Sequence, residues 1–174
     1  MRFAPLLACL AFAAVPAFAQ DTAPKTYSGN FAGADHDDHG TLTITPAPNG
    51  VILRIEAKGL KPGWHAVHFH EKGSCDDEKF ASAGGHVHNT TPVVHGYLSA
   101  GANDAGDLPN IYVGEDGHAN VEVFSNLVTA TKVDVRPYLI DDDGSAVVIH
   151  DMADDYQSQP IGNAGGRAAC AAIQ

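Results

Sequence analysis

The sequence predicts an all-β domain, an antiparallel β-sandwich or flattened barrel with two long functional loops. Many short stretches alternate apolar with polar or β-branched residues, and turn-forming Gly, Pro, Asn and Asp separate them. The sequence shows no convincing amphipathic helix of useful length. Residues 71–110 and 151–168 are rich in Gly, Asp, Ser and Asn and show no helical periodicity. Loops of this length are uncommon in a compact domain unless they carry function.

The first strands are predicted between residues 41 and 70. Residues 41–45 alternate Thr with Leu and Ile, and residues 51–58 resume an apolar, β-branched run. The Asn-Gly pair at residues 49–50 lies between them and is a strong hairpin signal. A Pro-Gly turn at residues 62–63 then leads into a strand-like segment, residues 65–70.

Further strands are predicted after the first long loop. Residues 111–113 and 119–124 flank a Gly-Glu-Asp-Gly turn at residues 114–117. The turn at residues 141–144, Asp-Asp-Asp-Gly, precedes an apolar strand at residues 146–150. We find no internal repeat and no second domain in the sequence.

The first 19 residues are typical of a secretory signal peptide. Arg2 precedes a short apolar run, and an Ala-Phe-Ala cleavage site follows at residues 17–19. The run is too short for a membrane anchor, and Cys9 comes too early for a lipoprotein processing site. Cleavage would leave a polar N-terminal segment, residues 20–39, which we expect to be flexible, and a domain over residues 40–174. We therefore expect a periplasmic or extracellular protein, with no membrane association in its mature form.

The chain is acidic and rich in histidine. Its 174 residues include 21 Asp and Glu, 10 Lys and Arg, and 10 His, for a formal net charge of −11 at pH 7. Loss of Arg2 with the signal peptide would bring the mature charge to −11 − 1 = −12. This balance argues against nucleic acid or anionic lipid as the main partner, because both need clustered Lys and Arg. The abundance of His indicates metal binding.

Two cysteines, Cys75 and Cys170, remain after removal of the signal peptide. An even pair in an exported chain predicts one disulfide. Two free or metal-binding thiols are the alternative, which the lack of a CxxC motif weakens.

Two histidines on one predicted strand, His68 and His70, are expected to bind one metal ion together. Positions i and i+2 of a strand point to the same face, so both imidazoles can reach one ion. His65 has the opposite parity and is expected beside the site or in the core. His86 and His150 are bracketed by Gly- and Asp-rich loops and complete a set of imidazoles that suits Cu, Zn, Ni or Fe.

A second group combines imidazoles with carboxylates. His86, His95, Asp104 and Asp107 lie within 22 positions, and nitrogen and oxygen ligands in this number fit Zn. Because an imidazole has two ring nitrogens, His86 can belong to both groups and bridge two metals. Three other histidines are expected on the surface: His36, His39 and His118.

Taken together, the motifs resemble the copper/zinc superoxide dismutase family over roughly residues 40–172. Six segments carry the resemblance: GWHAVHFHE at 63–71, SAGGH at 82–86, HG at 95–96, GDLPN at 106–110, VVIHDMADD at 147–155 and GNAGGRAAC at 162–170. The resemblance implies a Greek-key β-sandwich.

The resemblance also implies roles for individual residues. The copper ligands are matched by His68, His70, His86 and His150, with His86 as the imidazolate that bridges copper and zinc. The zinc ligands are matched by His95 and Asp107. Arg167 matches the arginine at the mouth of the copper channel, and Asp154 the carboxylate that ties a copper histidine to a zinc histidine. Cys75 and Cys170 match the intrasubunit disulfide.

Three departures from the family pattern are present. Asp104 stands where the family usually has a zinc-binding His, so Asp104 ligates through oxygen, His88 takes its place, or zinc binds weakly. The loop at residues 87–92 replaces the usual Phe-Asn-Pro run. Ala66 and Ala171 stand where the family has Gly. The copper set shows no departure.

The implied activity is that of an oxidoreductase, which disproportionates superoxide to O₂ and H₂O₂ by one-electron Cu(II)/Cu(I) cycling. Zinc, which has no redox chemistry, would hold the bridging His86. Because the substrate is an anion and the chain is negative, Arg167 is expected to attract it locally. Lys72, Lys79 and Lys132 are further candidates for steering. The alternative function is a non-enzymatic periplasmic copper- or zinc-binding module on the same fold. A homodimer and a monomer both stay open.

Overall fold

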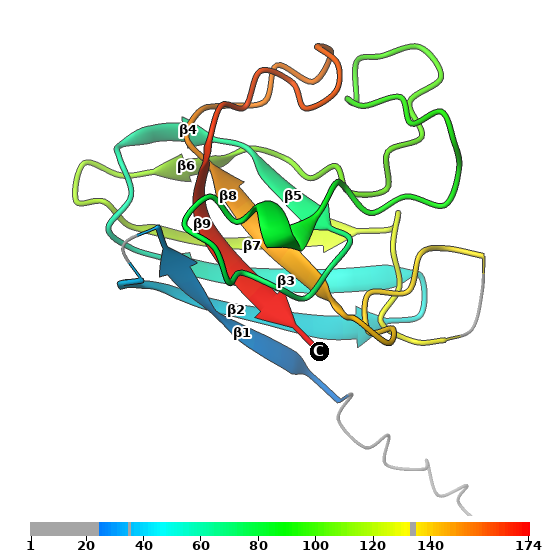
Figure 1. The fold of residues 1–174 in the computed structure, drawn as a ribbon, viewed down its shortest axis with the longest axis horizontal. Helices are drawn as coiled ribbons and strands as arrows, with labels where there is room; N and C mark the ends of the chain where they lie inside the picture. Colours follow the sequence, from blue (N-terminus) through cyan, green and yellow to red (C-terminus); the bar gives the residue numbers. More distant parts are fainter. Residues whose placement is uncertain (1–24, 35, 133–134) are drawn as a thin grey trace, which may run out of the picture.

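The computed structural model describes residues 25–34, 36–132 and 135–174, which form β-strands joined by long loops (Figure 1). The strands are β1 (Tyr27–Gly33), β2 (Asp38–Ala47), β3 (Gly50–Ala57), β4 (Gly63–His65), β5 (Val67–His70), β6 (Ile111–Val113), β7 (Ala119–Ser125), β8 (Ser145–His150) and β9 (Arg167–Ile173). The one helical element among the described residues is a 3-10 turn, Ala81–Ala83. The predicted all-β class is confirmed.

Seven strands form one curled antiparallel sheet in the order β5-β8-β9-β1-β2-β3-β7. β4 and β6 form a separate two-stranded antiparallel sheet. The predicted Asn-Gly hairpin joins β2 to β3, whose pairing runs from Ala47 opposite Gly50 to Gly40 opposite Ala57. After β3 the chain passes through β4 to β5, which lies at the opposite edge of the large sheet, and after β6 it returns beside β3 as β7.

The main core lies inside the curl of the sheet. Alternate residues of β2 and β3 point inward, among them Leu42, Ile44, Leu53 and Ile55, and all four are fully buried. Phe69 of β5, the edge strand on the other side of the sheet, packs in the same core. Burial of each such side chain contributes about 1.5–3 kcal/mol, so the sheet is a rigid base for its loops.

The polar segment before residue 40 was expected to be flexible, and this expectation is wrong for its described part. Tyr27–Gly33 is strand β1, which pairs with β2 on one side and with β9 on the other. Phe31 of this strand is 1% exposed and packs in the main core. The domain therefore includes β1. The predicted signal peptide, residues 1–19, lies outside the described residues.

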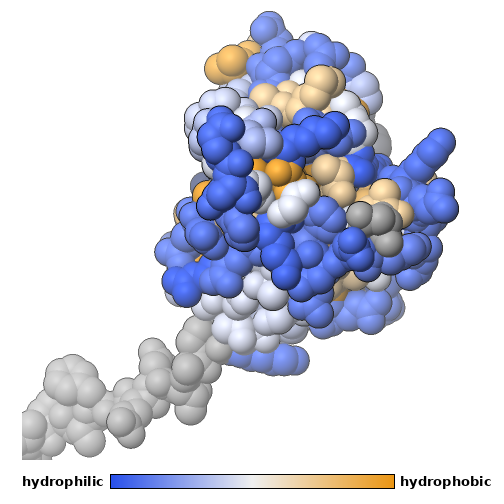
Figure 2. Space-filling view, turned by 90° about the vertical axis from the view of Figure 1, so that its left-hand side faces the viewer, coloured by the Kyte–Doolittle hydropathy of each residue, from blue (hydrophilic) through white to orange (hydrophobic). Residues whose placement is uncertain are grey.

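Two long loops leave the sheet at opposite ends of the antiparallel pair β5 and β8, and they approach each other away from the sheet (Figure 1). The first joins β5 to β6, and the second joins β8 to β9. They contact each other, because the Leu98 N–H donates to the Tyr156 carbonyl at 2.9 Å. Figure 2 shows that one face of the molecule is mainly hydrophilic, with only small apolar areas. No helix in the described part of the chain could cross a membrane.

Candidate functional site

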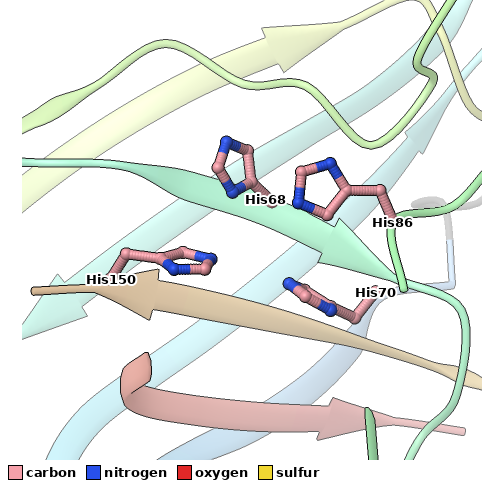
Figure 3. Close-up of side chains that lie close together, drawn as sticks. All are labelled: His68, His70, His86 and His150. Atoms are coloured by element: carbon pink, nitrogen blue, oxygen red, sulfur yellow. The ribbon is translucent and has the colours of Figure 1, made fainter. Parts of the chain in front are cut away.

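Four imidazoles from three parts of the chain point into one buried space (Figure 3). His68 and His70 lie on β5, as their spacing predicts, and His150 ends β8, the strand that pairs with β5. His86 comes from the long loop and lies opposite His70 in an isolated β-bridge. Each of the four is at most 7% exposed. Sheet pairing thus assembles the predicted copper set.

Five buried ring nitrogens of these histidines have no partner among the described residues. They are His68 Nδ1, His70 Nε2, His86 Nε2 and both ring nitrogens of His150. One ligand atom from each residue lies within 4.8 Å of all the others. Nitrogens about 2.0–2.1 Å from a common ion would lie at most about 4.2 Å apart. Because buried polar atoms are normally paired, this set fits a bound metal ion, and its all-imidazole chemistry suits copper.

The remaining ring nitrogens of His68 and His70 are held by hydrogen bonds. His70 Nδ1 lies 3.0 Å from the Gly84 carbonyl, and His68 Nε2 lies 3.0 Å from Asp154 Oδ2. Because a carbonyl and a carboxylate only accept, each bond puts the proton on that nitrogen and leaves the inward nitrogen bare.

Burial also favours the neutral form of three histidines in the four-histidine cluster. Burial lowers the pKa of His68. Burial lowers the pKa of His70 to about 3, helped by the nearby His86 and Arg167. Burial lowers the pKa of His150 to about 2, and the neighbouring His68 and His70 act in the same direction. The imidazoles of His70 and His150 are therefore neutral at pH 7, as metal binding requires.

The second predicted group is also assembled, around the other nitrogen of His86. His86 Nδ1 lies 2.7 Å from Asp104 Oδ2, and His95 Nδ1 lies 3.2 Å from the same oxygen. Asp107 Oδ1 lies 2.6 Å from His95 Nδ1 and 4.0 Å from His86 Nδ1. All four residues are buried, and their ligand atoms lie within 4.8 Å of one another. Two nitrogens and two oxygens fit zinc.

Each carboxylate of the second group has one oxygen fixed by the backbone. The Gly106 N–H donates to Asp104 Oδ1 at 3.0 Å, and the Gly96 N–H donates to Asp107 Oδ2 at 2.8 Å. The other oxygen of each is thereby aimed at the two imidazoles. Gly106 itself must lack a side chain, because a Cβ there would lie 2.7 Å from the Phe69 carbonyl oxygen and 2.8 Å from the His86 Cβ.

Asp154 connects the two clusters. Its Oδ2 binds His68 Nε2, and its Oδ1 lies 3.1 Å from His95 Nε2. Although burial raises the pKa of Asp154, hydrogen bonds from His68 and His95 outweigh burial and hold that pKa below its ordinary value. Conversely, burial lowers the pKa of His95, but Asp104, Asp107 and Asp154 raise it to about 11.

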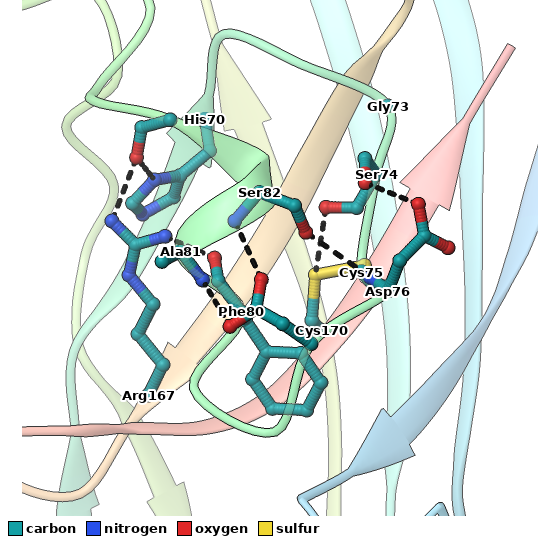
Figure 4. The surroundings of a disulfide bond; sticks show 12 residues. His70, Gly73, Ser74, Cys75, Asp76, Phe80, Ala81, Ser82, Arg167 and Cys170 are labelled. Carbon is teal, nitrogen blue, oxygen red and sulfur yellow. Dashed lines mark hydrogen bonds between the residues drawn. A yellow bond between two sulfur atoms is a disulfide. The ribbon is translucent and has the colours of Figure 1, made fainter.

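Arg167 lies at the start of β9, next to the four-histidine cluster (Figure 4). Its guanidinium donates to the Phe80 carbonyl, and also to the Gly84 carbonyl at 2.7 Å. The Gly84 oxygen also accepts from His70. These bonds use two of the five N–H donors of the guanidinium, and the side chain is half-buried.

A disulfide holds the loop that carries these carbonyls. Cys75 and Cys170 are bonded across a sequence separation of 95 residues, which confirms the predicted pair (Figure 4). Cys170 packs with Phe80, Ala83 and Val148 in a small second core on the outer face of β8 and β9. The disulfide and this core together fix the carbonyls that hold Arg167.

Some predicted residues lie outside both clusters. His65 is buried, and its ring nitrogens lie 2.6 Å and 2.7 Å from the carbonyls of His150 and Lys61, so it supports the backbone of a cluster residue. His88 is exposed and binds the His86 carbonyl at 2.8 Å, so Asp104, and not His88, completes the second group. Three lysines are exposed: Lys72, Lys79 and Lys132.

Sequence reasoning missed the residue that holds Asp154 in place. The Asn110 amide donates to the Asp154 carbonyl at 2.9 Å, and its oxygen accepts from the Asp154 N–H at 2.8 Å. The Asn110 N–H donates to the Tyr156 hydroxyl at 2.6 Å. The position of Asn110 at the end of the Gly-Asp-Leu-Pro-Asn segment was the available signal.

Comparisons with known proteins agree with this geometry. The sequence model of copper/zinc superoxide dismutases (SODC) matches residues 38–173. The chain is 53% identical over 140 residues to a Cu-Zn superoxide dismutase of Caulobacter vibrioides, with 80% of each chain covered. It is 40% identical over 136 residues to the Cu-Zn superoxide dismutase 2 of Aquifex aeolicus, with 78% of each covered. A crystal structure of a SOD-like protein from Bacillus subtilis matches with a TM-score of 0.78 and 34% identity, covering 84% of this chain and 97% of the other.

Proposed function

The chain belongs to the copper/zinc superoxide dismutase family, and from this premise we propose which of its residues carry the reaction. The reaction is the disproportionation of two superoxide ions and two protons to O₂ and H₂O₂, and the family binds copper and zinc. In this chain the copper ligands are His68, His70, His86 and His150. The zinc ligands are His86, His95, Asp104 and Asp107.

The buried, unpartnered nitrogens of the four-histidine cluster are the observation that carries this assignment. Copper supplies one-electron cycling between Cu(II) and Cu(I), whereas zinc supplies a fixed positive charge without redox chemistry. The protein contributes by fixing the tautomers of His68 and His70 through Asp154 and the Gly84 carbonyl, and by keeping His70 and His150 neutral through burial.

His86 is the residue that holds and moves a proton. Its Nε2 faces the first cluster and its Nδ1 faces the second. It accepts a proton at Nε2 while the first superoxide ion is oxidised to O₂. It donates that proton to the peroxide that forms when the second superoxide ion is reduced. Water supplies the other proton of H₂O₂. The position of Nδ1 in the second cluster keeps the ring in place throughout.

Arg167 attracts and orients the anionic substrate. The full chain has a formal charge of −11, so the distant field repels superoxide. Screening limits that repulsion beyond about 8–10 Å at physiological salt, and a guanidinium close to the site can reverse the sign locally. The two carbonyls that accept from Arg167 hold its charge beside His70.

One experiment tests the assignment. The purified mature protein is analysed for copper and zinc and assayed for superoxide decay in parallel. We expect both metals and fast decay, and we expect chelation of copper to abolish the activity. Copper binding without dismutation would instead favour a non-enzymatic metal-binding module.

We also propose that the protein is exported and acts in the periplasm or outside the cell. The signal-like residues 1–19 support export. The disulfide between Cys75 and Cys170 supports an oxidising compartment, where such bonds persist. Mass spectrometry of protein from the periplasmic fraction should find a chain that begins at Gln20. A full-length chain confined to the cytoplasm would contradict export.

A further inference from the structure

The second group of ligands contains a carboxylate, Asp104, at the position where the family usually has an imidazole. It is 3% exposed, and the Gly106 N–H occupies its Oδ1. Its Oδ2 lies 2.7 Å from His86 Nδ1. The Asp104 side chain thus meets a donor at one oxygen and an imidazole nitrogen at the other, and a carboxylate can only accept hydrogen bonds.

An acceptor at this position determines which nitrogen of His86 carries the proton. With no ion in the second cluster, a 2.7 Å contact to a carboxylate requires a proton on His86 Nδ1. A neutral imidazole has only one N–H, so Nε2 is then bare. His86 Nε2 is buried, has no partner among the described residues, and faces the other three imidazoles (Figure 3). This is the state that a copper ligand needs.

The other carboxylate of the group, Asp107, does not accept a hydrogen bond from His86. Asp107 Oδ1 lies 4.0 Å from His86 Nδ1, beyond hydrogen-bond distance, but 2.6 Å from His95 Nδ1. Asp104 is thus the one acid of the pair within hydrogen-bond distance of His86, and the same Asp104 oxygen also lies 3.2 Å from His95 Nδ1. A histidine in place of Asp104 could donate or accept, so it would leave the tautomer of His86 unfixed until a metal ion arrived.

We propose that Asp104 is a positioning residue that prepares His86 for copper, so that the chain binds copper without zinc. The proposal rests on the proposed function of the four-histidine cluster. Zinc and Asp104 act on the same nitrogen, His86 Nδ1. Zinc would bind this nitrogen directly, and without zinc the Asp104 carboxylate accepts a hydrogen bond from its N–H. In either case Nε2 stays bare and aimed at the copper site.

Asp104→Asn is the decisive variant. Asparagine has the same size, but only one of its two terminal atoms accepts hydrogen bonds. If that oxygen keeps the Gly106 N–H, the NH₂ group faces His86 Nδ1 and demands an acceptor there. The proton of His86 then moves to Nε2, the nitrogen that must bind copper. Asp142→Asn is the control, because it removes the same charge at an exposed turn before β8, outside both clusters.

Nitrogen-15 NMR of the metal-free full mature chain reads the tautomer directly. We expect the Nδ1–H form of His86 in the wild type and in Asp142→Asn, and the Nε2–H form in Asp104→Asn. An Nε2–H or doubly protonated His86 in the wild type would overturn the proposal.

Copper binding gives an independent readout. In zinc-free buffer we expect Asp104→Asn to lose about 10–100-fold in Cu(II) affinity, the range for a lost hydrogen-bond partner of a ligand. Its Cu(II) paramagnetic resonance spectrum should also change, while the affinity and the spectrum of Asp142→Asn remain near wild type. Asp104→His should show weakened copper binding that added zinc restores. Equal zinc-free affinities in the wild type, Asp104→Asn and Asp104→His would refute the proposal.

The activity of the wild type loaded with both metals distinguishes a failure of the proposed function from a failure of the proposed role of Asp104. If this form fails to dismute superoxide, the proposed function is wrong. If it dismutes superoxide but the Asp104 variants bind copper normally without zinc, only the role of Asp104 is wrong.

Discussion

Asp154 Oδ2 lies 3.0 Å from His68 Nε2, and both side chains are fully buried. The other oxygen of this carboxylate lies 3.1 Å from Nε2 of a zinc-side imidazole, His95. Because one acceptor orients one ligand of each cluster, the two metal sites share a support, and a change at Asp154 reaches both.

We expect Asp154→Asn to weaken both metals. Asparagine can accept from only one of the two imidazoles, and its NH₂ group opposes the N–H of the other. Affinity for copper, zinc or both should fall by about 10–100-fold, the usual range when such a partner is lost. Competition with chelators of known affinity measures this. Asp155→Asn, which alters the neighbouring exposed acid, is the control, and equal losses in both variants would contradict the role of Asp154.

We expect Arg167→Ala to slow capture of the substrate while copper stays bound. Removing a guanidinium that steers an anion should lower kcat/KM by about tenfold or more, and it should flatten the dependence of kcat/KM on ionic strength. Arg167→Lys keeps the charge but loses the paired carbonyl contacts, so we expect an intermediate rate. An unchanged rate and salt slope in Arg167→Ala, with copper content equal to wild type, would remove Arg167 from this role.

The sequence was sufficient to predict the strands in which apolar and polar residues alternate. It was also sufficient to predict which histidines of one strand share a face. His68 and His70 share a face because they are two residues apart on β5, and Phe69 packs on the opposite side in the core. The Asn-Gly pair gave the β2–β3 hairpin because that turn favours it. These predictions depend on local geometry alone.

Two neighbouring strands, β1 and β9, were not predicted because their residues are poor local indicators of a strand. β9 consists mainly of Ala, and it is a strand because its two faces lie between two cores: Ala169 and Ala171 pack on one, Cys170 on the other. Only small residues fit there, so tertiary packing overrides strand propensity. The part played by Asn110 likewise depends on a contact 44 residues away in sequence, which no local pattern encodes.

We expect loss of the disulfide to affect both stability and activity. Replacing Cys75 and Cys170 with Ser opens a loop of 95 residues and should lower the free energy of unfolding by about 4 kcal/mol on the chain-entropy estimate. The carbonyls of Phe80 and Gly84 would also be freed, so Arg167 would lose its fixed position. Urea unfolding of the metal-free protein and kcat/KM of the loaded protein measure the two effects. Normal kcat/KM in a destabilised variant would show that Arg167 does not depend on this loop.

The depressed pKa values of His70 and His150 in the four-histidine cluster predict acid sensitivity of the metal-free protein. The pKa of His70 is about 3 and that of His150 about 2, below the value near 6.5 that applies when the chain is unfolded. At pH values between the folded and unfolded pKa, the unfolded chain binds more protons than the folded protein. The contribution of each histidine to the free energy of unfolding is therefore fully present above pH 6.5 and is lost as pH falls. Each histidine should remove about 2 kcal/mol between pH 7 and pH 5.

His95 offsets only a small part of this loss. Its pKa is raised to about 11, so its contribution is fully present below about pH 6.5 and is lost as pH rises toward 11. Urea unfolding of the metal-free wild type at pH 7 and pH 5 should therefore show a net loss of stability in acid. His70→Gln should reduce that loss by about 2 kcal/mol, whereas His118→Gln, at an exposed turn, is the control for removing any histidine. Equal stability of the wild type at the two pH values would mean that the copper histidines are not held neutral by burial.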